Sequence, residues 1–219
     1  MKKVRIISAI VATAGVITLS AFTLKNNNVA LATSDATVET TTGTAVQKWE
    51  LDRSHSNIGF SVEHMLVSET TGKFRKFEGS LLADKADFTD AQVEFTADVN
   101  SIDTEDETRD GHLKGDDFFN AAKFPQIKFK STGFKKIDGT KYILSGALTI
   151  RDVTKNVEWA VITSGIQKDP WGNTKAGFRA TVILNRFDYN LKWNTLTEAG
   201  GAVVGKDVTI KVNVEFKKL

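Results

Sequence analysis

Apolar and polar residues alternate with a period of two along most of the chain from Trp49 onward. This period places successive side chains on opposite faces of an extended strand, so each alternating run predicts a half-buried β-strand. The runs span Ile58–His64, Phe74–Leu82, Val93–Val99, Ile127–Phe129, Tyr142–Ile150, Val157–Val161, Phe178–Leu184 and Val208–Phe216. We therefore expect an all-β domain, an antiparallel barrel of about eight strands, which is a number typical of small barrels.

Turn residues separate these runs. Asp138-Gly139 lies between two runs and is a strong hairpin signal. Asp169-Pro170-Trp171-Gly172 joins a later pair, and Gly200-Gly201 precedes the last run. Their regular spacing supports an antiparallel connection from each strand to the next.

One segment, from Ser101 to Asn120, breaks the alternation. Thr104 with Glu107 three residues later fits a capping box, and Gly115 is suited to end a helix. We predict a short helix over Glu105–Lys114 and a further turn around Phe118 and Phe119. In a barrel, such a segment is expected to cap one end.

The first residues differ in character from the rest. Lys2, Lys3 and Arg5 precede an apolar and small-residue run from Ile6 to Leu24, and Ala30-Leu31-Ala32 follows. This arrangement predicts a secretory signal over residues 1–32. A retained membrane anchor is the alternative, because 19 residues approach the length of a bilayer span, although polar residues interrupt the run. We expect export to the periplasm and, after cleavage, no stable membrane span.

Residues 33–48 are rich in Thr and poor in large apolar side chains, which predicts a flexible linker before a domain over residues 49–219. Removing residues 1–32 takes away four basic residues and no acidic ones, so the formal charge changes from +2 to −2. The mature charge gives no electrostatic support to nucleic-acid binding. Because the chain has no cysteine, disulfides and thiolate metal sites are excluded.

The inward-facing positions define the predicted interior. At ~3.4 Å per residue, the longer runs enclose a space roughly 25–30 Å long, which fits an extended hydrocarbon. The alternative is that the aromatic rings simply fill the barrel as its core. On the shared parity of positions, we predict a tunnel lined by Phe60, Val62, Phe95, Val99, Phe129, Leu148, Phe178, Val182 and Ile210.

The helical cap supplies further candidate ligand contacts. Its acidic face must stay solvated because burying unpaired carboxylates is costly, so Phe118 and Phe119 are predicted to face the ligand. Arg109, His112 and His64 are then expected near the mouth, where the polar head of an amphiphile would lie. The alternative for the two phenylalanines is that they plug the barrel end.

Two further arginines, Arg151 and Arg186, offer planar donor groups that suit an anionic head group. Structural ion pairs explain these arginines equally well. The sequence leaves both explanations open.

Catalytic and metal sites find little support. Asp52, His55 and Ser56 are hydrolase-type residues, but adjacent strand positions point to opposite faces and no G-x-S-x-G motif is present. His55 and His64 differ by an odd number of positions, and no H-E-x-x-H motif occurs. We predict no enzyme, no cofactor and no metal site.

An acidic cluster in the helical segment raises the question of calcium. Its spacing lacks the Gly and Glu that an EF-hand loop requires, so a solvated acidic helix is the better interpretation. The cluster consists of Asp103, Asp106, Asp110, Asp116 and Asp117.

The order of motifs resembles the YceI-like family of bacterial lipid-binding proteins across residues 49–219. The matching stretches are Trp49-Glu50-Leu51-Asp52, His55-Ser56, His64-Met65, Ser101-Ile102-Asp103-Thr104, Arg109-Asp110-Gly111-His112-Leu113, Asp117-Phe118-Phe119, Gly146-Ala147-Leu148-Thr149-Ile150 and Asn185-Arg186. One departure follows Arg186: the family commonly has an Asp-Phe-Gly step where this chain has Asp188-Tyr189-Asn190.

The resemblance implies a lipocalin-like antiparallel barrel with a central hydrophobic tunnel that binds polyisoprenoids, such as quinone or polyprenyl-phosphate tails, or related amphiphiles. We therefore expect an exported lipid carrier for a polyisoprenoid, quinone or fatty-chain lipid, with a homodimer left open. The alternatives are an accessory enzyme or redox-associated protein acting on a bound quinone or lipid, and an assembly or stress-related interaction protein whose tunnel is incidental.

Overall fold

The computed structural model describes residues 46–219 except residues 197 and 199. The predicted signal over residues 1–32 and most of the predicted linker lie outside the described residues. Two residues at the end of that linker belong to the barrel. Lys48 is the first residue of the first strand, and Gln47 Nε2 donates a hydrogen bond to Leu219 O at 2.8 Å.

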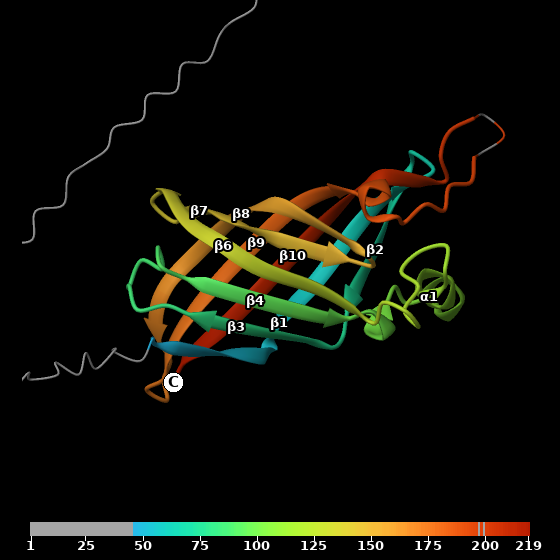
Figure 1. The fold of residues 1–219 in the computed structure, drawn as a ribbon. Helices are drawn as coiled ribbons and strands as arrows, with labels where there is room; N and C mark the ends of the chain where they lie inside the picture. Colours follow the sequence, from blue (N-terminus) through green and yellow to red (C-terminus); the bar gives the residue numbers. More distant parts are fainter. Residues whose placement is uncertain (1–45, 197, 199) are drawn as a thin grey trace, which may run out of the picture. The chain divides into compact units, whose positions relative to one another are not determined.

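Among the described residues, ten antiparallel strands form one sheet, and eight of them close into a barrel (Figure 1). Around the ring the order is β1, β10, β9, β8, β7, β6, β4 and β3, and β3 pairs again with β1. The ring strands are β1 (Lys48–His64), β3 (Phe77–Leu82), β4 (Gln92–Asp98), β6 (Gln126–Asp138), β7 (Lys141–Ile150), β8 (Val153–Lys168), β9 (Thr174–Asn185) and β10 (Val204–Lys218). The predicted eight-stranded barrel is confirmed.

Two strands extend the barrel at one end. β2 (Ser68–Phe74) pairs with the second half of β1, and β5 (Ile102–Asp103) pairs with the end of β2. The predicted run Phe74–Leu82 is therefore two strands, because the chain leaves the ladder between Phe74 and Phe77.

The fourth strand ends one residue earlier than predicted. Val99 begins a short 3-10 helix, η1 (Val99–Ser101), because the side chain of Asp98 accepts a hydrogen bond from Asn100 N and closes a turn. The period-two assignment of Val99 to a strand is therefore wrong. Its side chain is buried, so the apolar pattern continues although the strand does not.

The predicted short helix is present as α1 (Glu107–Lys114), but its cap differs. Asp106 Oδ1, not Thr104, accepts the hydrogen bond from Arg109 N at 3.0 Å. Glu105 has φ +64°, in the left-handed region, so a helix cannot begin there. The predicted capping box is wrong, whereas Gly115 ends the helix as expected.

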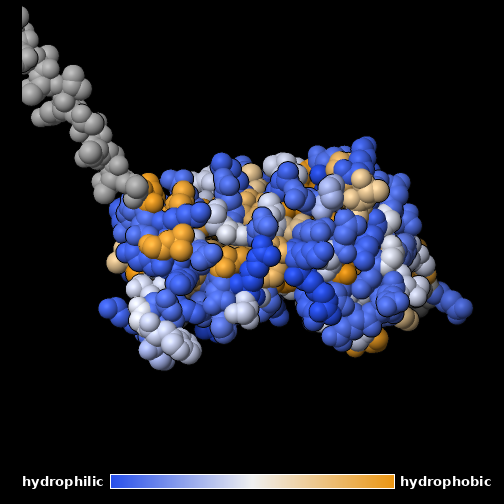
Figure 2. All heavy atoms as spheres, turned by 90° about the horizontal axis from the view of Figure 1, so that it is seen from below, coloured by the Kyte–Doolittle hydropathy of each residue, from blue (hydrophilic) through white to orange (hydrophobic). Residues whose placement is uncertain are grey.

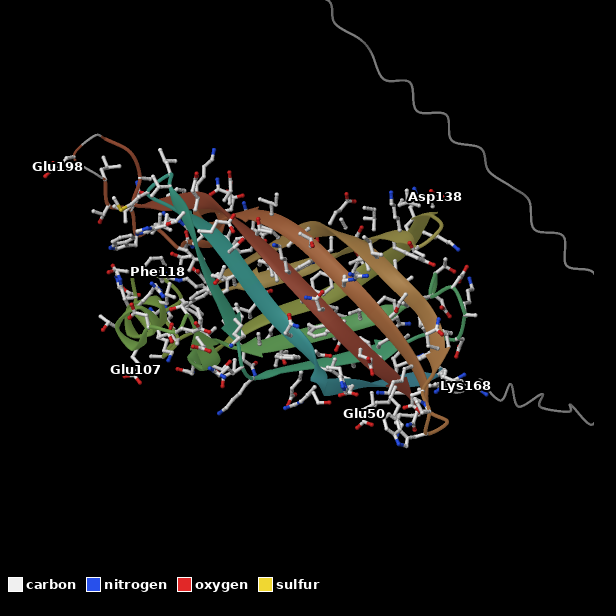
Figure 3. The ribbon with its side chains drawn as sticks, turned by 180° about the vertical axis from the view of Figure 1, so that it is seen from behind. Glu50, Glu107, Phe118, Asp138, Lys168 and Glu198 are labelled. Carbon is white, nitrogen blue, oxygen red and sulfur yellow. The ribbon has the colours of Figure 1, made fainter. Side chains whose placement is uncertain are left out.

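The two ends of the barrel differ. At the end where β1 begins, Phe88 is buried and its ring packs on Trp49 at 5.3 Å and on Phe178 at 5.0 Å between centroids. The helix α1 lies at the other end, where β1 finishes (Figure 1). Figure 3 shows Glu107, Phe118 and Glu198 at this end and Asp138 and Lys168 at the opposite end.

Candidate ligand-binding site

The barrel interior contains a cavity of about 110 Å³. All eight ring strands contribute to its lining, and Thr96 is the one polar residue among the described residues that line it. Inward alternation along each strand produces this lining, as in β7, where every second residue is buried. The predicted tunnel residues that line the cavity are Phe95, Phe129, Leu148, Phe178 and Ile210.

Aromatic rings fill most of the interior. Phe178 packs edge-on against Phe134 at 6.1 Å and against Phe216 at 6.2 Å, and Phe216 packs on Phe95 at 6.4 Å. In each of these pairs the edge of one ring meets the face of the other, which is a favoured aromatic geometry. The rings therefore surround the small cavity and pack on one another.

A second, larger cavity of about 490 Å³ lies at the end of the barrel beside α1. We call it the mouth cavity. Eight predicted ligand contacts line it: Phe60, Val62, His64, Arg109, His112, Phe118, Phe119 and Ile210. Sequence reasoning thus placed residues from two strands and from the helical segment around one space.

Three residues line both cavities: Phe74, Ile127 and Ile210. Their side chains form the partition between the barrel cavity and the mouth cavity. Phe74 contacts Phe60 at 6.0 Å and Phe119 at 6.1 Å between ring centroids. A ligand that enters at the mouth must displace the Phe74 ring and the neighbouring side chains of the partition to reach the barrel interior.

The remaining two predicted tunnel residues, Val99 and Val182, line neither cavity. Val182 points inward from β9 but is buried in the main apolar core. Val99 is buried in η1, where its N–H donates to Pro125 O at 2.9 Å. Val182 still lies among the other predicted contacts, since it pairs with Ile210 across the strands and packs in one core cluster with Phe129. Val99 does not belong to that cluster.

Arg186 is the most deeply buried charge at the mouth cavity, with 3% of its surface exposed. Its Nε donates to Gly205 O at 2.8 Å, and its Nη2 donates to Val204 O at 3.2 Å. Its Nη1 donates to Leu191 O at 2.8 Å and to Trp193 O at 2.6 Å. Burial lowers the pKa of the guanidinium, because removal from water disfavours the charged form. All four of these bonds end on backbone carbonyls. Arg186 therefore ties the segment 191–205 to the barrel.

Arg109 is held at the start of the cap. Its Nε donates to Thr104 Oγ1 at 2.8 Å and its Nη2 donates to Thr104 O at 2.7 Å. Thr104 in turn donates from its backbone N–H and its hydroxyl to Asp110 Oδ1. This network fixes the orientation of α1 and leaves part of the Arg109 guanidinium at the mouth cavity, opposite Asp106.

His112 connects α1 to the segment that follows β9. Its ring stands edge-on to Phe118 at 5.0 Å and to Trp193 at 5.4 Å, and its Nε2 lies 3.1 Å from Asp117 Oδ2. Trp193 also packs on Phe118 at 5.6 Å. Trp193 is a mouth residue that sequence reasoning missed, because it lies in an irregular segment without periodicity.

Arg151, unlike Arg186, lies outside the mouth cavity. Its Nη1 donates to the carbonyls of Asp116, Phe118 and Asn190 at 3.0, 2.7 and 2.9 Å. This arginine joins the end of the cap to the turn after β9. Of the two explanations left open for it, a structural role fits these contacts.

A polar cluster at the opposite end of the barrel brings together residues weighed for catalysis. β1 is irregular between Asp52 and Asn57, so His55 Nδ1 meets both Asp52 Oδ2 and Ser54 Oγ at 3.0 Å. Hydrogen bonds from Ser54 and His55 hold the pKa of the Asp52 carboxyl well below its usual range. Because Ser54 and Asp52 share one ring nitrogen, the imidazole does not lie between them as a serine hydrolase requires.

The same cluster has metal-ligand residue types. Atoms of Asp52, His55 and Glu215 lie within 4.8 Å of one another. However, Lys175 Nζ donates to Asp52 at 3.1 Å and to Glu215 at 2.5 Å. The ammonium group therefore takes the position between the two carboxylates that a cation would need.

The acidic residues of the helical segment have separate protein partners. Asp103 pairs with Arg75, Asp106 with Arg109, Asp110 with Thr104, Asp117 with His112, and Asp116 with Asn120 and Arg151. Their carboxylates point to different neighbours rather than to a common centre. Of the five, only Asp110 lies within α1, and Asp103 lies in β5.

Comparison with known proteins identifies the family. The model of the YceI-like domain matches residues 49–216. The chain belongs to the YceI-like family. A UPF0312 protein of Photorhabdus laumondii is 39% identical over 145 residues, which cover 66% of this chain and 75% of the relative.

Solved YceI-like structures have the same fold. The Campylobacter jejuni YceI protein is 29% identical, with a TM-score of 0.61 over 77% of this chain and 96% of that one. A polyisoprenoid binding domain from Saccharophagus degradans has a TM-score of 0.56 over 80% of this chain and 99% of that one. At 15% identity, the second likeness concerns the fold alone.

Proposed function

We propose that this YceI-like protein is an exported carrier that binds a polyisoprenoid or a similar long-chain amphiphile, with the apolar tail in the barrel and the polar head at the mouth. The observation that carries the proposal is the pair of adjoining cavities. One is lined by apolar side chains with Thr96 as the exception, and the other adds charged groups on one rim.

The tail is bound by the hydrophobic effect. Each buried methylene contributes ~0.8 kcal/mol, so a five-carbon isoprene unit contributes roughly 3–4 kcal/mol before entropic costs. Several units in the barrel are therefore enough to offset both the cost of immobilising the ligand and the movement of aromatic rings. The shape and apolarity of the interior favour a narrow hydrocarbon over a compact ligand.

The head group is proposed to lie among the polar residues of the mouth cavity. Arg109 and His112 offer N–H donors there, whereas Glu63 and Asp106 offer acceptors. Arg186 uses four of its five N–H groups on backbone carbonyls and has one left to offer. Guanidinium groups suit phosphate or carboxylate oxygens, and the two acids leave room for a neutral hydroxyl or carbonyl head. The donors are held by networks that do not depend on the ligand, so the site is largely pre-formed.

The comparisons support this proposal at the level of the fold. The Saccharophagus degradans domain with the same barrel is described as polyisoprenoid binding. The predicted secretory signal supports the exported, periplasmic location, where an apolar chain needs shielding from water. Among the described residues, no helix has both the length and the apolarity to cross a membrane.

Native mass spectrometry of the purified protein, followed by lipid extraction, tests the proposal. We expect a mass increase equal to one amphiphile per chain, with a hydrocarbon tail of several isoprene or acyl units. The proposal would be contradicted if the protein purified from cells did not bind a fluorescent prenyl probe.

A cavity-filling pair of variants makes the test specific. Val212→Phe adds a ring to the barrel cavity, whereas Ile183→Phe adds the same ring on the exposed face of β9. We expect the first variant to lose the prenyl probe by more than tenfold in affinity and the second to bind normally. Thermal unfolding of both variants verifies that each is folded.

A further inference from the structure

The tip of the β1–β2 hairpin carries three consecutive exposed apolar residues. Met65, Leu66 and Val67 expose 47%, 70% and 83% of their surfaces. Figure 2 shows one face of the molecule, which is mainly hydrophilic with scattered hydrophobic groups. Single exposed apolar residues are ordinary, but three in succession at the end of a hairpin need an explanation.

The backbone of this tip is strained. Val67 N donates to His64 O at 3.2 Å, which closes a β-turn whose central residues are Met65 and Leu66. Both have positive φ, +53° and +61°, which is the type I′ arrangement. Asn-Gly is the favoured pair at these positions, and bulky apolar side chains are disfavoured there. The sequence thus keeps apolar side chains at the tip at a cost in stability.

The tip stands at the rim of the mouth cavity. Met65 N donates to Val203 O at 2.9 Å, and His64, Val203 and Val204 line the cavity. Leu196, also exposed, lies in the neighbouring segment and forms a bridge with Ala202. Figure 1 shows this segment and the hairpin tip side by side at the end of the barrel.

We propose that residues 65–67, with Leu196, form a membrane-docking element that inserts into the surface of a lipid bilayer and holds the mouth cavity against it. The choice of a lipid surface rests on the proposed function, since an amphiphile that resides in a bilayer enters the barrel most directly where the mouth meets that bilayer. The tip then shortens the path of the tail through water.

The size of the element favours a bilayer over a protein partner. The four side chains expose on the order of 400 Å², whereas each side of a standard protein interface buries ~800 Å². A second copy of the chain docked at this tip would therefore bury too little area for a stable dimer. Insertion of a few apolar side chains into the acyl boundary of a bilayer needs no larger area.

Charge around the tip is mixed. Glu63, Glu69, Lys206 and Asp207 lie on the flanking strands, and Glu198 lies in the segment of Leu196. Because acidic groups outnumber the lysine, attraction to anionic lipid does not supply the binding, and apolar burial does. We expect similar insertion into phosphatidylcholine vesicles with and without phosphatidylglycerol, and little dependence on salt.

Site-specific labelling of the full chain tests the proposal, because the chain has no cysteine of its own. Val67→Cys and Lys168→Cys, each carrying an environment-sensitive dye, report the tip and the opposite end of the barrel (Figure 3). With vesicles, we expect a blue-shifted emission and quenching by lipid-attached quenchers at position 67 and neither at 168. The label position is decisive because the apolar run from Ile6 to Leu24 can bind lipid by itself.

The other outcomes overturn the proposal. Insertion at position 168 alone, or at neither position, shows that the tip is not the docking element. A blue shift that appears without vesicles as protein concentration rises shows that a second copy covers the tip. Lipid extraction from the same preparation separates this result from the carrier function: bound amphiphile without tip insertion contradicts docking only, and tip insertion without bound amphiphile contradicts the carrier only.

A second pair of variants uses the strained turn. Met65→Asn with Leu66→Gly installs the favoured type I′ pair, so we expect a higher melting temperature. We also expect the contribution of the tip to vesicle affinity to fall by more than tenfold, because two apolar side chains are lost. Ile166→Asn, on an exposed position of β8, is the matched control and leaves binding unchanged. A variant with a favoured turn that inserts as well as the original chain would contradict the proposal.

Discussion

Phe118 and Phe119 are adjacent, yet the structure predicts different responses to truncation. Phe118 is buried in the main core and packs on His112 and Trp193. Phe119 is half-buried and makes an edge contact with Phe74, one of the residues between the two cavities. Truncating a fully buried Phe costs ~3–5 kcal/mol, which we expect for Phe118→Ala. For Phe119→Ala, partial burial reduces the loss in free energy of unfolding to ~1–2 kcal/mol, including the aromatic pair.

Ligand release is expected to separate the two variants further. Removing the Phe119 ring takes away an edge contact that supports Phe74 in the partition between the mouth cavity and the barrel cavity. If the ring contributes ~1.4 kcal/mol to holding the chain in place, its loss speeds release about tenfold. Phe118→Ala acts mainly on stability, because its ring packs on His112 and Trp193 rather than on the partition.

Stopped-flow displacement of a fluorescent prenyl probe measures the release rate, and urea unfolding measures stability. Phe124→Ala is the matched control, because Phe124 is half-buried but lines neither cavity. Equal losses of stability in Phe118→Ala and Phe119→Ala, with unchanged release from both, would mean that the two rings only plug the barrel end. That result refutes the proposed role of Phe119 in supporting the partition between the two cavities.

Three further predictions follow from buried or paired polar groups. The pKa of Asp52 is lowered in the folded chain, so its contribution to stability is present above pH ~4 and is lost as pH falls; urea midpoints at falling pH should decline less in Asp52→Asn. Burial raises the pKa of Tyr189 to about 12, so its contribution is lost as pH rises above ~10. Because the buried Tyr189 hydroxyl has no hydrogen-bond partner among the described residues, Tyr189→Phe should melt no lower at neutral pH and resist alkaline unfolding better. Arg186→Met removes four hydrogen bonds to carbonyls of the segment 191–205, so the free energy of unfolding measured in urea should fall by about 3 kcal/mol. Arg186→Lys should not recover this stability, because Lys lacks the planar guanidinium fork.

The ring strands were predictable because one side of each faces a single apolar interior. In β7 buried and less buried positions alternate without a break, and the sequence shows the same period. β2 gave no such signal, because its residues are mainly polar and only Phe74, at its end, is buried in an apolar cluster, whereas Thr70 borders the mouth cavity. A hydrophobic period reports a strand only where one face is dry.

The mouth was predictable only in part. Parity predicted that Phe60 and Val62 face the interior, but as tunnel residues, whereas they line the mouth cavity. The break in alternation pointed to the helical segment. Trp193 and the bonds of Arg186 were not predictable, because they belong to a segment without a period whose position depends on tertiary hydrogen bonds. The cap of α1 was misassigned for a related reason: Thr104 and Asp106 both suit a helix start, and the left-handed Glu105 between them decides.

Backbone strain gives an independent indication of where this YceI-like protein works. Seven non-glycine residues in the described part of the chain have positive φ, and five of them, Met65, Leu66, Glu105, Asn120 and Asn190, lie in the hairpin tip, at the ends of the cap or in the turn after β9. Asn190 stands where the family commonly has glycine, and Asn tolerates this conformation better than most residues. Met65 and Leu66 differ from Asn190 in this respect, because neither side chain suits the left-handed region. Backbone strain of this kind persists where the surrounding structure imposes it. It is found most often at functional sites, where residues depart from their usual conformational preferences. These five strained residues lie at one end of the barrel. Their position favours that end as the site of ligand and membrane binding, with the rest of the barrel as its scaffold.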